Sequence, residues 1–259
     1  MSLVFAAHTP YSSLLVNSIA KESAEKLQAT KNALKKIAEE LYLARPQILV
    51  VICNEKKDDY FSLNAATELF SNFEDFGEYD FKKKYFGAND FAGLIKNNSE
   101  MKIKILNEEK NDISISIPLF FIAENLPNTK ILVIYTADQT KKNYLEFGKV
   151  LKNIFIKSSR RIAILATGNM SHSLKTESPA GFTKEGLEYD KKIIELLEAH
   201  NSTGITNLDS DFVKNANESN YHSLLLLLSI IQNMNYEFKN LAYEAPFGVG
   251  YLTGYFDFK

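Results

Sequence analysis

The feature that most constrains the fold is a set of short apolar runs, rich in β-branched residues and free of polar interruption. They cover residues 3–7, 48–52, 131–135 and 162–166. Runs without polar alternation are typical of strands buried on both faces, as in parallel sheets that helices cover on each side. The sequence therefore predicts a mostly parallel central sheet.

Segments with helical periodicity separate these runs. In residues 22–43 the apolar positions recur at helical spacing, and Pro46 follows before the next strand. Similar patterns predict helices over residues 144–156 and 184–200. Strand and helix alternate along the chain, which indicates an α/β fold with helices on both sides of the sheet. No linker or repeat interrupts the pattern, so we expect one domain over residues 1–259.

Residues 68–91 differ from the rest because Phe and Tyr are dense there among Lys, Asp and Glu, without a clear period. An insertion of this kind fits a lid or a dimer contact, and a homodimer or a partner subunit is one expectation. The simpler interpretation is that its aromatic side chains pack on the main core.

Charge and cysteine content restrict the class of protein. Thirty Lys and Arg residues face 32 Asp and Glu residues, and this balance argues against a nucleic-acid partner. A single cysteine, Cys53, cannot form an internal disulfide, so we expect a reducing, cytoplasmic location. The longest apolar stretch, residues 224–231, is far shorter than the roughly 20 residues of a membrane span, so no membrane partner is expected.

Polar residues that directly follow the predicted strands are the first candidates for a site. Ligands bind to open parallel sheets in the crevice at the carboxyl ends of the strands. His8, Asn54 with Glu55, and His172 follow three of these strands, and Glu244 precedes the last apparent strand. We expect the first three groups to lie at one edge of the sheet.

Three motifs in this order resemble the class III extradiol ring-cleavage dioxygenases, including their Memo-like relatives. They are His8-Thr9-Pro10 after the first strand, GNMSHSL at residues 168–174, and EAPFGVGYLTGYF at residues 244–256. The resemblance extends along the whole chain and implies the family's α/β fold.

The resemblance also implies a mechanism. His8 and Glu244 would hold a non-haem Fe(II), and His172 would transfer protons, with O₂ as the co-substrate of a catechol-like or aminophenol-like aromatic. Two imidazoles and a carboxylate leave positions on iron free for substrate and O₂. By the same resemblance, the substrate would contact Asn54, Ser171 and Pro246.

Two positions depart from the family pattern. The second ligand histidine is replaced in VVICNE at residues 50–55, which leaves Glu55 as the candidate third metal ligand. A further family histidine is missing near Asn111 and Asp112. A carboxylate in place of an imidazole lowers the charge of the site by one and opposes binding of a doubly deprotonated catechol.

Other interpretations stay open. The chain is either an active dioxygenase or a Memo-like, degenerate relative that acts as a binding or interaction module. A hydrolase with Cys53 as nucleophile is a third hypothesis. His200 and His222 are interpreted as packing residues, and the C-terminal glycines do not form a dinucleotide-binding fingerprint because too little chain follows them.

Overall fold

The computed structural model describes residues 2–54 and 59–259, and its centre is an eight-stranded sheet in the order β6-β3-β7-β2-β8-β1-β10-β9. A separate hairpin pairs β4 with β5. The strands are β1 (Leu3–Thr9), β2 (Ile48–Cys53), β3 (Ser62–Asn64), β4 (Glu68–Phe73), β5 (Glu78–Phe86), β6 (Lys104–Leu106), β7 (Lys130–Tyr135), β8 (Ile162–Thr167), β9 (Tyr236–Glu244) and β10 (Tyr251–Phe258).

The four predicted strands form the middle of this sheet, where β7, β2, β8 and β1 run parallel. Every residue of β2 and β8 is buried, because helices cover both faces. On one side β1 pairs with β10, and β10 with β9, both antiparallel. The predicted fold class, an α/β domain with a mostly parallel sheet, is confirmed.

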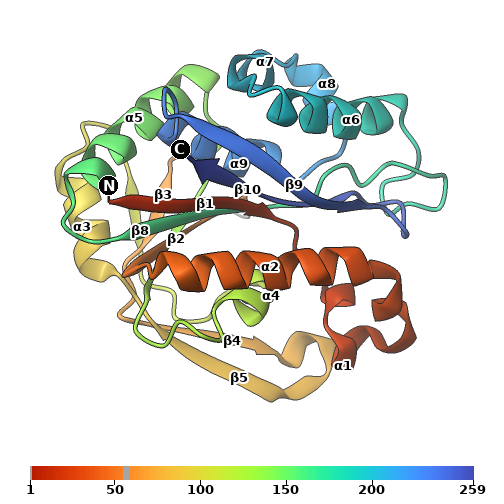
Figure 1. Cartoon of the computed structure of the whole chain (residues 1–259), viewed down its shortest axis with the longest axis horizontal. Helices are drawn as coiled ribbons and strands as arrows, with labels where there is room; N and C mark the ends of the chain where they lie inside the picture. Colours follow the sequence, from red (N-terminus) through yellow and green to blue (C-terminus); the bar gives the residue numbers. More distant parts are fainter. Residues whose placement is uncertain (1, 55–58) are drawn as a thin grey trace.

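Helices form a layer on each face of the sheet (Figure 1). One layer contains α3 (Asn89–Asn97), α5 (Lys141–Lys157), α6 (Lys184–Glu198), α7 (Ser202–Thr206), α8 (Ser210–Asn215) and α9 (Tyr221–Ile230). The opposite layer contains α2 (Gln28–Ala44), α4 (Ile113–Ile122) and the β4–β5 hairpin, with α1 (Asn17–Ala20) beside them. Below, these are called the α9 face and the α2 face. Within the described residues, no helix combines the length and apolar character that a membrane crossing requires.

The helix predicted over residues 22–43 is split in the structure. A 3-10 segment, Lys21–Leu27, precedes α2, and Leu27 between them leaves helical geometry with φ −116° and ψ 33°. The apolar stripe of Leu34, Ile37 and Leu41 is buried against the sheet as expected. Periodicity located the buried face correctly but did not locate the start of the helix.

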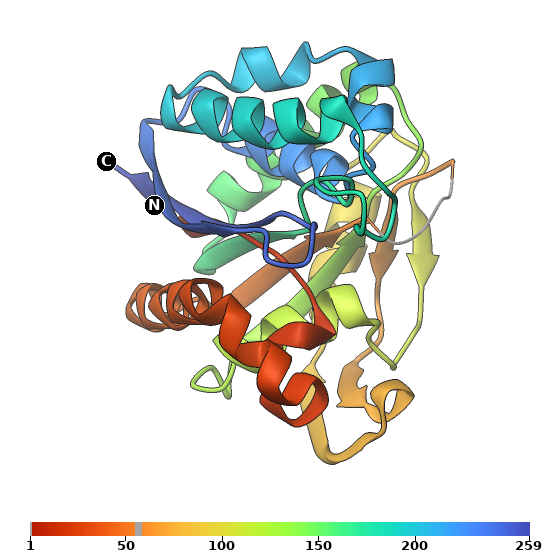
Figure 2. The same ribbon diagram turned by 90° about the vertical axis from the view of Figure 1, so that its right-hand side faces the viewer.

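The aromatic segment forms the β4–β5 hairpin and the start of α3 (Figure 2). Phe73 is buried and stacks on Phe81, with ring centroids 4.6 Å apart, and both rings contact Phe120 of α4. Tyr79 and Phe86 remain exposed at 67% and 55%. The segment therefore packs in part on the α2 face, and its use in a homodimer stays a prediction.

Candidate functional site at the carboxyl edge of the sheet

His8 lies near the end of β1 and is completely buried. Its Nδ1 is 3.1 Å from the carbonyl oxygen of Leu252, and because a carbonyl only accepts, Nδ1 carries the proton. Its Nε2 accepts from the side-chain amide of Asn220 at 3.4 Å. Burial lowers the pKa of His8 to about 4, although the Leu252 carbonyl acts in the opposite direction. His8 is thus a neutral imidazole with a protein partner at each nitrogen.

Asn220 fixes this imidazole at the beginning of α9. Its Oδ1 accepts from the Tyr189 hydroxyl at 2.9 Å, and its Nδ2 lies 3.1 Å from the sulfur of Met170. Asn220 and Tyr189 are buried, so the network is shielded from water. His8 therefore belongs to a packed hydrogen-bonded network on the α9 face.

Glu244 occupies a different place from His8. Its carboxylate accepts from the backbone N–H groups of Ala29 and Thr30, at 3.2 and 2.8 Å, and from the Thr30 hydroxyl at 2.6 Å. The first N–H groups of a helix have no partner within the helix, and a carboxylate there also complements the helix dipole. Glu244 therefore caps α2 across 215 residues of chain.

The two residues predicted to share a metal ion lie on opposite faces of the sheet. Side chains alternate along a strand. Ala6, two residues before His8, belongs to the core on the α9 face, and the contacts of His8 lie there too. The contacts of Glu244 are with α2 on the other face. The structure does not bring this pair together.

His172 lies in the loop after β8. Its backbone N–H donates to the carbonyl of Asn217 at 3.0 Å, and its own carbonyl accepts from Ala180 N–H at 3.2 Å. The side-chain Nε2 is buried without a hydrogen-bond partner, and burial lowers the pKa of the imidazole. An unpaired nitrogen on a mostly neutral imidazole is what a proton-transferring group requires, so the predicted role of His172 stays open.

Ser171 is held by the protein rather than directed to a ligand. Its backbone N–H donates to Asp190 at 2.8 Å, and its hydroxyl donates to the Ala216 carbonyl at 2.7 Å. Its side chain is fully buried. This places Ser171 as an anchor for the loop that carries His172.

The remaining predicted residues lie at separate points. The Thr136 hydroxyl donates to Oδ1 of Asn54 at 2.7 Å, which links the ends of β7 and β2. Pro246 lies between β9 and β10, where its carbonyl accepts from the Lys175 ammonium at 3.5 Å. Glu55 lies outside the described residues.

Two acidic residues on the α9 face were not predicted from the sequence. Asp190 of α6 is 2% exposed, and its carboxylate accepts from Ser171 N–H and from the Tyr243 hydroxyl at 2.6 Å. Glu218 accepts from the backbone N–H of Tyr221 in the first turn of α9. Burial raises the pKa of each to about 7. The available signal for Glu218 was its position just before the apolar run of α9, where an acidic residue caps a helix.

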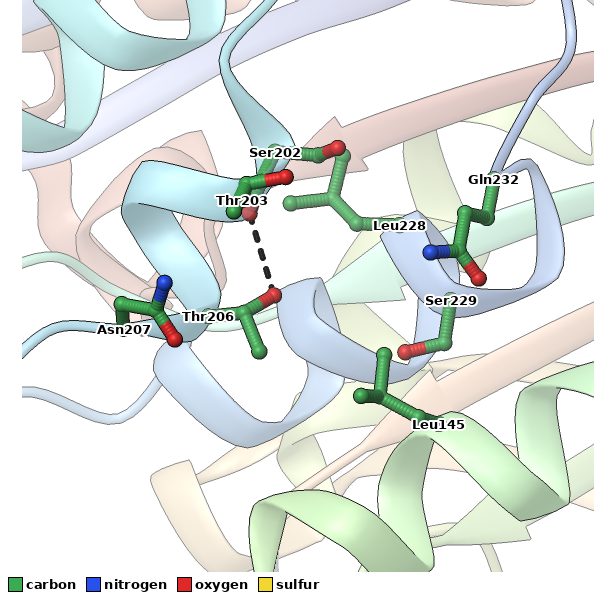
Figure 3. Close-up of a pocket in the computed structure, with 8 residues that line it drawn as sticks. All are labelled: Leu145, Ser202, Thr203, Thr206, Asn207, Leu228, Ser229 and Gln232. Atoms are coloured by element: carbon green, nitrogen blue, oxygen red, sulfur yellow. Dashed lines mark hydrogen bonds between the residues drawn. The ribbon is translucent and has the colours of Figure 1, made fainter.

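A small cavity of about 150 Å³ lies between α5, α7 and α9 (Figure 3). Hydroxyl and amide groups line it, and Thr206 donates to the Ser202 carbonyl at 3.0 Å. Ser229 and Gln232 place it at the carboxyl end of α9, whereas Asn220 and His8 lie at the amino end. This cavity is therefore separate from the carboxyl edge of the sheet.

The donor groups that the structure describes at the edge do not form a three-ligand metal centre. Within residues 2–54 and 59–259, no three His, Cys, Asp or Glu side chains gather as a metal-binding group. His8 has both nitrogens engaged, and Glu244 caps a helix on the other face. His8 and Glu218 do share the α9 face, where both contact the start of α9. Within the described residues, Asp190 lies on that face as well, but the three side chains are not gathered into a metal-binding group.

Comparisons with known proteins agree with the resemblance seen in the sequence. Residues 2–254 match the family described as the catalytic LigB subunit of aromatic ring-opening dioxygenase. Protein CA_C1420 of Clostridium acetobutylicum is 24% identical over 93% of this chain. The chain spans about half of that relative's length, 55%.

A solved structure shows the same fold. The uncharacterized protein JW3007 of Escherichia coli K12 superposes with a TM-score of 0.67 at 14% sequence identity, over 97% of this chain and 99% of that one. Dioxygenases of the matched family generally use a divalent metal. Because the family match covers residues 2–254, the chain belongs to the family of the catalytic LigB subunit of aromatic ring-opening dioxygenase.

Proposed function

We propose that this chain uses the ring-opening dioxygenase fold as a binding module and does not assemble an iron centre for ring cleavage. The observation that carries the proposal is the separation of His8 and Glu244 onto opposite faces of the sheet, each with protein partners. A ferrous ion in such a site needs two imidazoles and a carboxylate on one face. Here the imidazole of His8 is hydrogen-bonded at both nitrogens, and the carboxylate of Glu244 caps α2.

The groups that remain at the edge are hydrogen-bonding and carry reduced charge. His8 is uncharged, and Asp190 and Glu218 have pKa values raised to about 7 by burial. The unpaired Nε2 of His172 is the atom to which a ligand would add a hydrogen bond. Such surroundings favour a small, uncharged aromatic ligand over a doubly deprotonated catechol, because burying two negative charges beside acidic groups is costly.

The test is metal content after anaerobic reconstitution with Fe(II), followed by oxygen uptake with a panel of catechols and aminophenols. We expect iron far below one per chain and no ring-opened product. About one iron per chain that disappears in His8→Ala, together with oxygen uptake that depends on His172, would refute the proposal.

A second candidate is the extradiol dioxygenase itself, with Fe(II) and O₂, and the family match over residues 2–254 favours it. Its ligands would be His8, a carboxylate of the α9 face and Glu55. Glu218→Gln and Glu244→Gln separate the possible carboxylates, because Glu218 shares a face with His8 and Glu244 does not. Iron lost in Glu218→Gln and retained in Glu244→Gln would support this candidate.

A further inference from the structure

A second cavity, of about 720 Å³, lies beyond the carboxyl end of β1 on the α2 face. Its wall is built from the segment after β1, the 3-10 segment before α2, α2 itself and α4. Figure 1 shows α1 at one end of α2, with α4 beside that helix. The volume falls within the range of small-molecule sites, about 300–1,000 Å³. The cavity does not include His8, His172 or Asp190.

The lining carries an excess of positive charge. Lys21, Lys31 and Lys35 line the cavity with one acidic residue, Glu25. Within the part of the chain that the structure describes, none of the three lysines has a carboxylate within ion-pair distance. In contrast, Lys36, one residue along α2, pairs with Glu40 at 2.8 Å.

Lys31 is the buried member of this group, with 8% of its surface exposed. Its ammonium donates to the side-chain oxygen of Asn17 at 2.5 Å. Burial lowers the pKa of Lys31, and the attraction of Glu25 opposes this effect. A partly desolvated ammonium is stabilised by a charged partner, and a neutral amide oxygen compensates only in part. A bound anion would supply the missing charge.

The rest of the lining is apolar. Leu15, Val16 and Ala24 are buried at the cavity wall. Phe120 and Phe121 from α4 stand edge to face, with centroids 5.0 Å apart, and both retain partial exposure. Aromatic and aliphatic side chains of this kind stabilise a ligand by removing its apolar surface from water.

We propose that this cavity binds an organic anion, with a carboxylate on Lys31 and an apolar body against Phe120 and Phe121. The combination of a largely buried lysine side chain, an apolar wall and a small-molecule volume carries the inference. A bare inorganic anion would leave the apolar wall in water, and an uncharged molecule would leave Lys31 without a charged partner. The site is independent of the carboxyl-edge network on the α9 face.

The test is isothermal titration calorimetry of the whole chain at neutral pH with octanoate, octanol and inorganic phosphate. Octanoate has both the charge and the apolar body, and each of the other probes has one of them. We expect octanoate to bind at least about tenfold more tightly than either, because a hydrogen bond to a charged group is among the stronger ones. Equal binding of octanoate and octanol, tighter binding of phosphate, or no binding of octanoate overturns the proposal.

Lys31→Met tests the role of the ammonium, and Lys36→Met is the matched control on the exposed side of the same helix. We expect Lys31→Met to weaken the binding of octanoate at least about tenfold. The binding of octanol should be unchanged, because Met keeps the apolar stem of the side chain. Lys36→Met should bind octanoate as the parent does. A Lys31→Met protein that is folded by thermal unfolding and binds octanoate normally refutes the assignment. If Lys31→Met does not fold, Lys35→Met must weaken the binding of octanoate and leave the binding of octanol unchanged.

The octanoate measurements and the iron measurements test two different sites, so one proposal can fail without the other. The iron and oxygen measurements test His8 and His172, neither of which lines this cavity. Octanoate binding that persists in His8→Ala keeps the two sites separate. Loss of octanoate binding in His8→Ala with Lys31 intact would contradict their independence.

Discussion

Replacing Asp190 with Asn should remove a large pH dependence from the stability of the protein. Asp190 is 2% exposed, and its carboxyl group accepts from Ser171 N–H and the Tyr243 hydroxyl. Burial raises its pKa from the ordinary 3.8 to about 7, and the two hydrogen bonds oppose this only in part. Asn resembles the protonated acid, because its oxygen still accepts from Ser171 and its NH₂ faces Tyr243.

The direction of the pH dependence follows from which state of the protein, native or unfolded, holds the Asp190 proton. Between about pH 4 and 7 the native state keeps the Asp190 proton that the unfolded chain has released, so raising the pH favours unfolding. The difference between 3.8 and about 7 corresponds to about 4 kcal/mol, at about 1.4 kcal/mol for each tenfold change. The contribution is fully present below about pH 4 and is lost by about pH 7 to 8.

Guanidinium chloride unfolding at several pH values between about 4.5 and 8 measures this effect. We expect the free energy of unfolding of the parent, relative to Asp190→Asn, to fall by several kcal/mol over this range. Glu218 is a second acid nearby with a raised pKa, and the charge of Asp190 is the smallest of the causes that shift it, so Asp190→Asn also removes this minor repulsion. Asp211→Asn, on the exposed surface of α8, is the control for a general charge effect. A relative change below about 1 kcal/mol would refute the reasoning.

Two further predictions concern packing and capping. Glu244→Ala should lower the free energy of unfolding by about 2 kcal/mol, because it removes the cap of α2, and denaturant unfolding that shows no loss would contradict this role. Gly250→Ala should cost about 1–3 kcal/mol, because its Cβ would lie 2.1 Å from the Asp190 carboxylate. Gly93→Ala in α3 is the control, because its added Cβ meets nothing within 4 Å, and it should stabilise the protein by about 0.5–1 kcal/mol. Equal effects of Gly250→Ala and Gly93→Ala in thermal unfolding would argue against the close approach of Gly250 to Asp190.

The sequence predicts the middle of the sheet well, because a strand that is buried on both faces is an uninterrupted run of apolar residues. The run at residues 48–52 corresponds to β2, Ile48–Cys53, and the run at 162–166 to β8, Ile162–Thr167. Neither strand tolerates polar residues, so the pattern has few alternative explanations. The family could also be predicted, because each of its motifs is a short, contiguous stretch of sequence.

The candidate site was harder to predict because motif order does not specify the face of the sheet. Glu244 and Tyr243 are neighbours in β9, yet Tyr243 contacts Asp190 of α6 and Glu244 contacts α2. A shift of one residue exchanges the two faces, and the β9–β10 pairing contains an irregularity between Thr253 and Gly254. The position of a carboxylate in a motif therefore could not distinguish a ligand from a helix cap.

The order of the strands has a consequence for how this chain acquires its structure. β1 is made before its neighbours β8 and β10, which pair Ala6 with Ile164 and with Phe256. On the ribosome, β1 has neither partner until β2, β7 and β8 have all been synthesised. Long-range pairing of this kind slows folding and prolongs exposure of unpaired apolar segments. The nascent chain must therefore keep the apolar β1 from aggregating until β8 emerges.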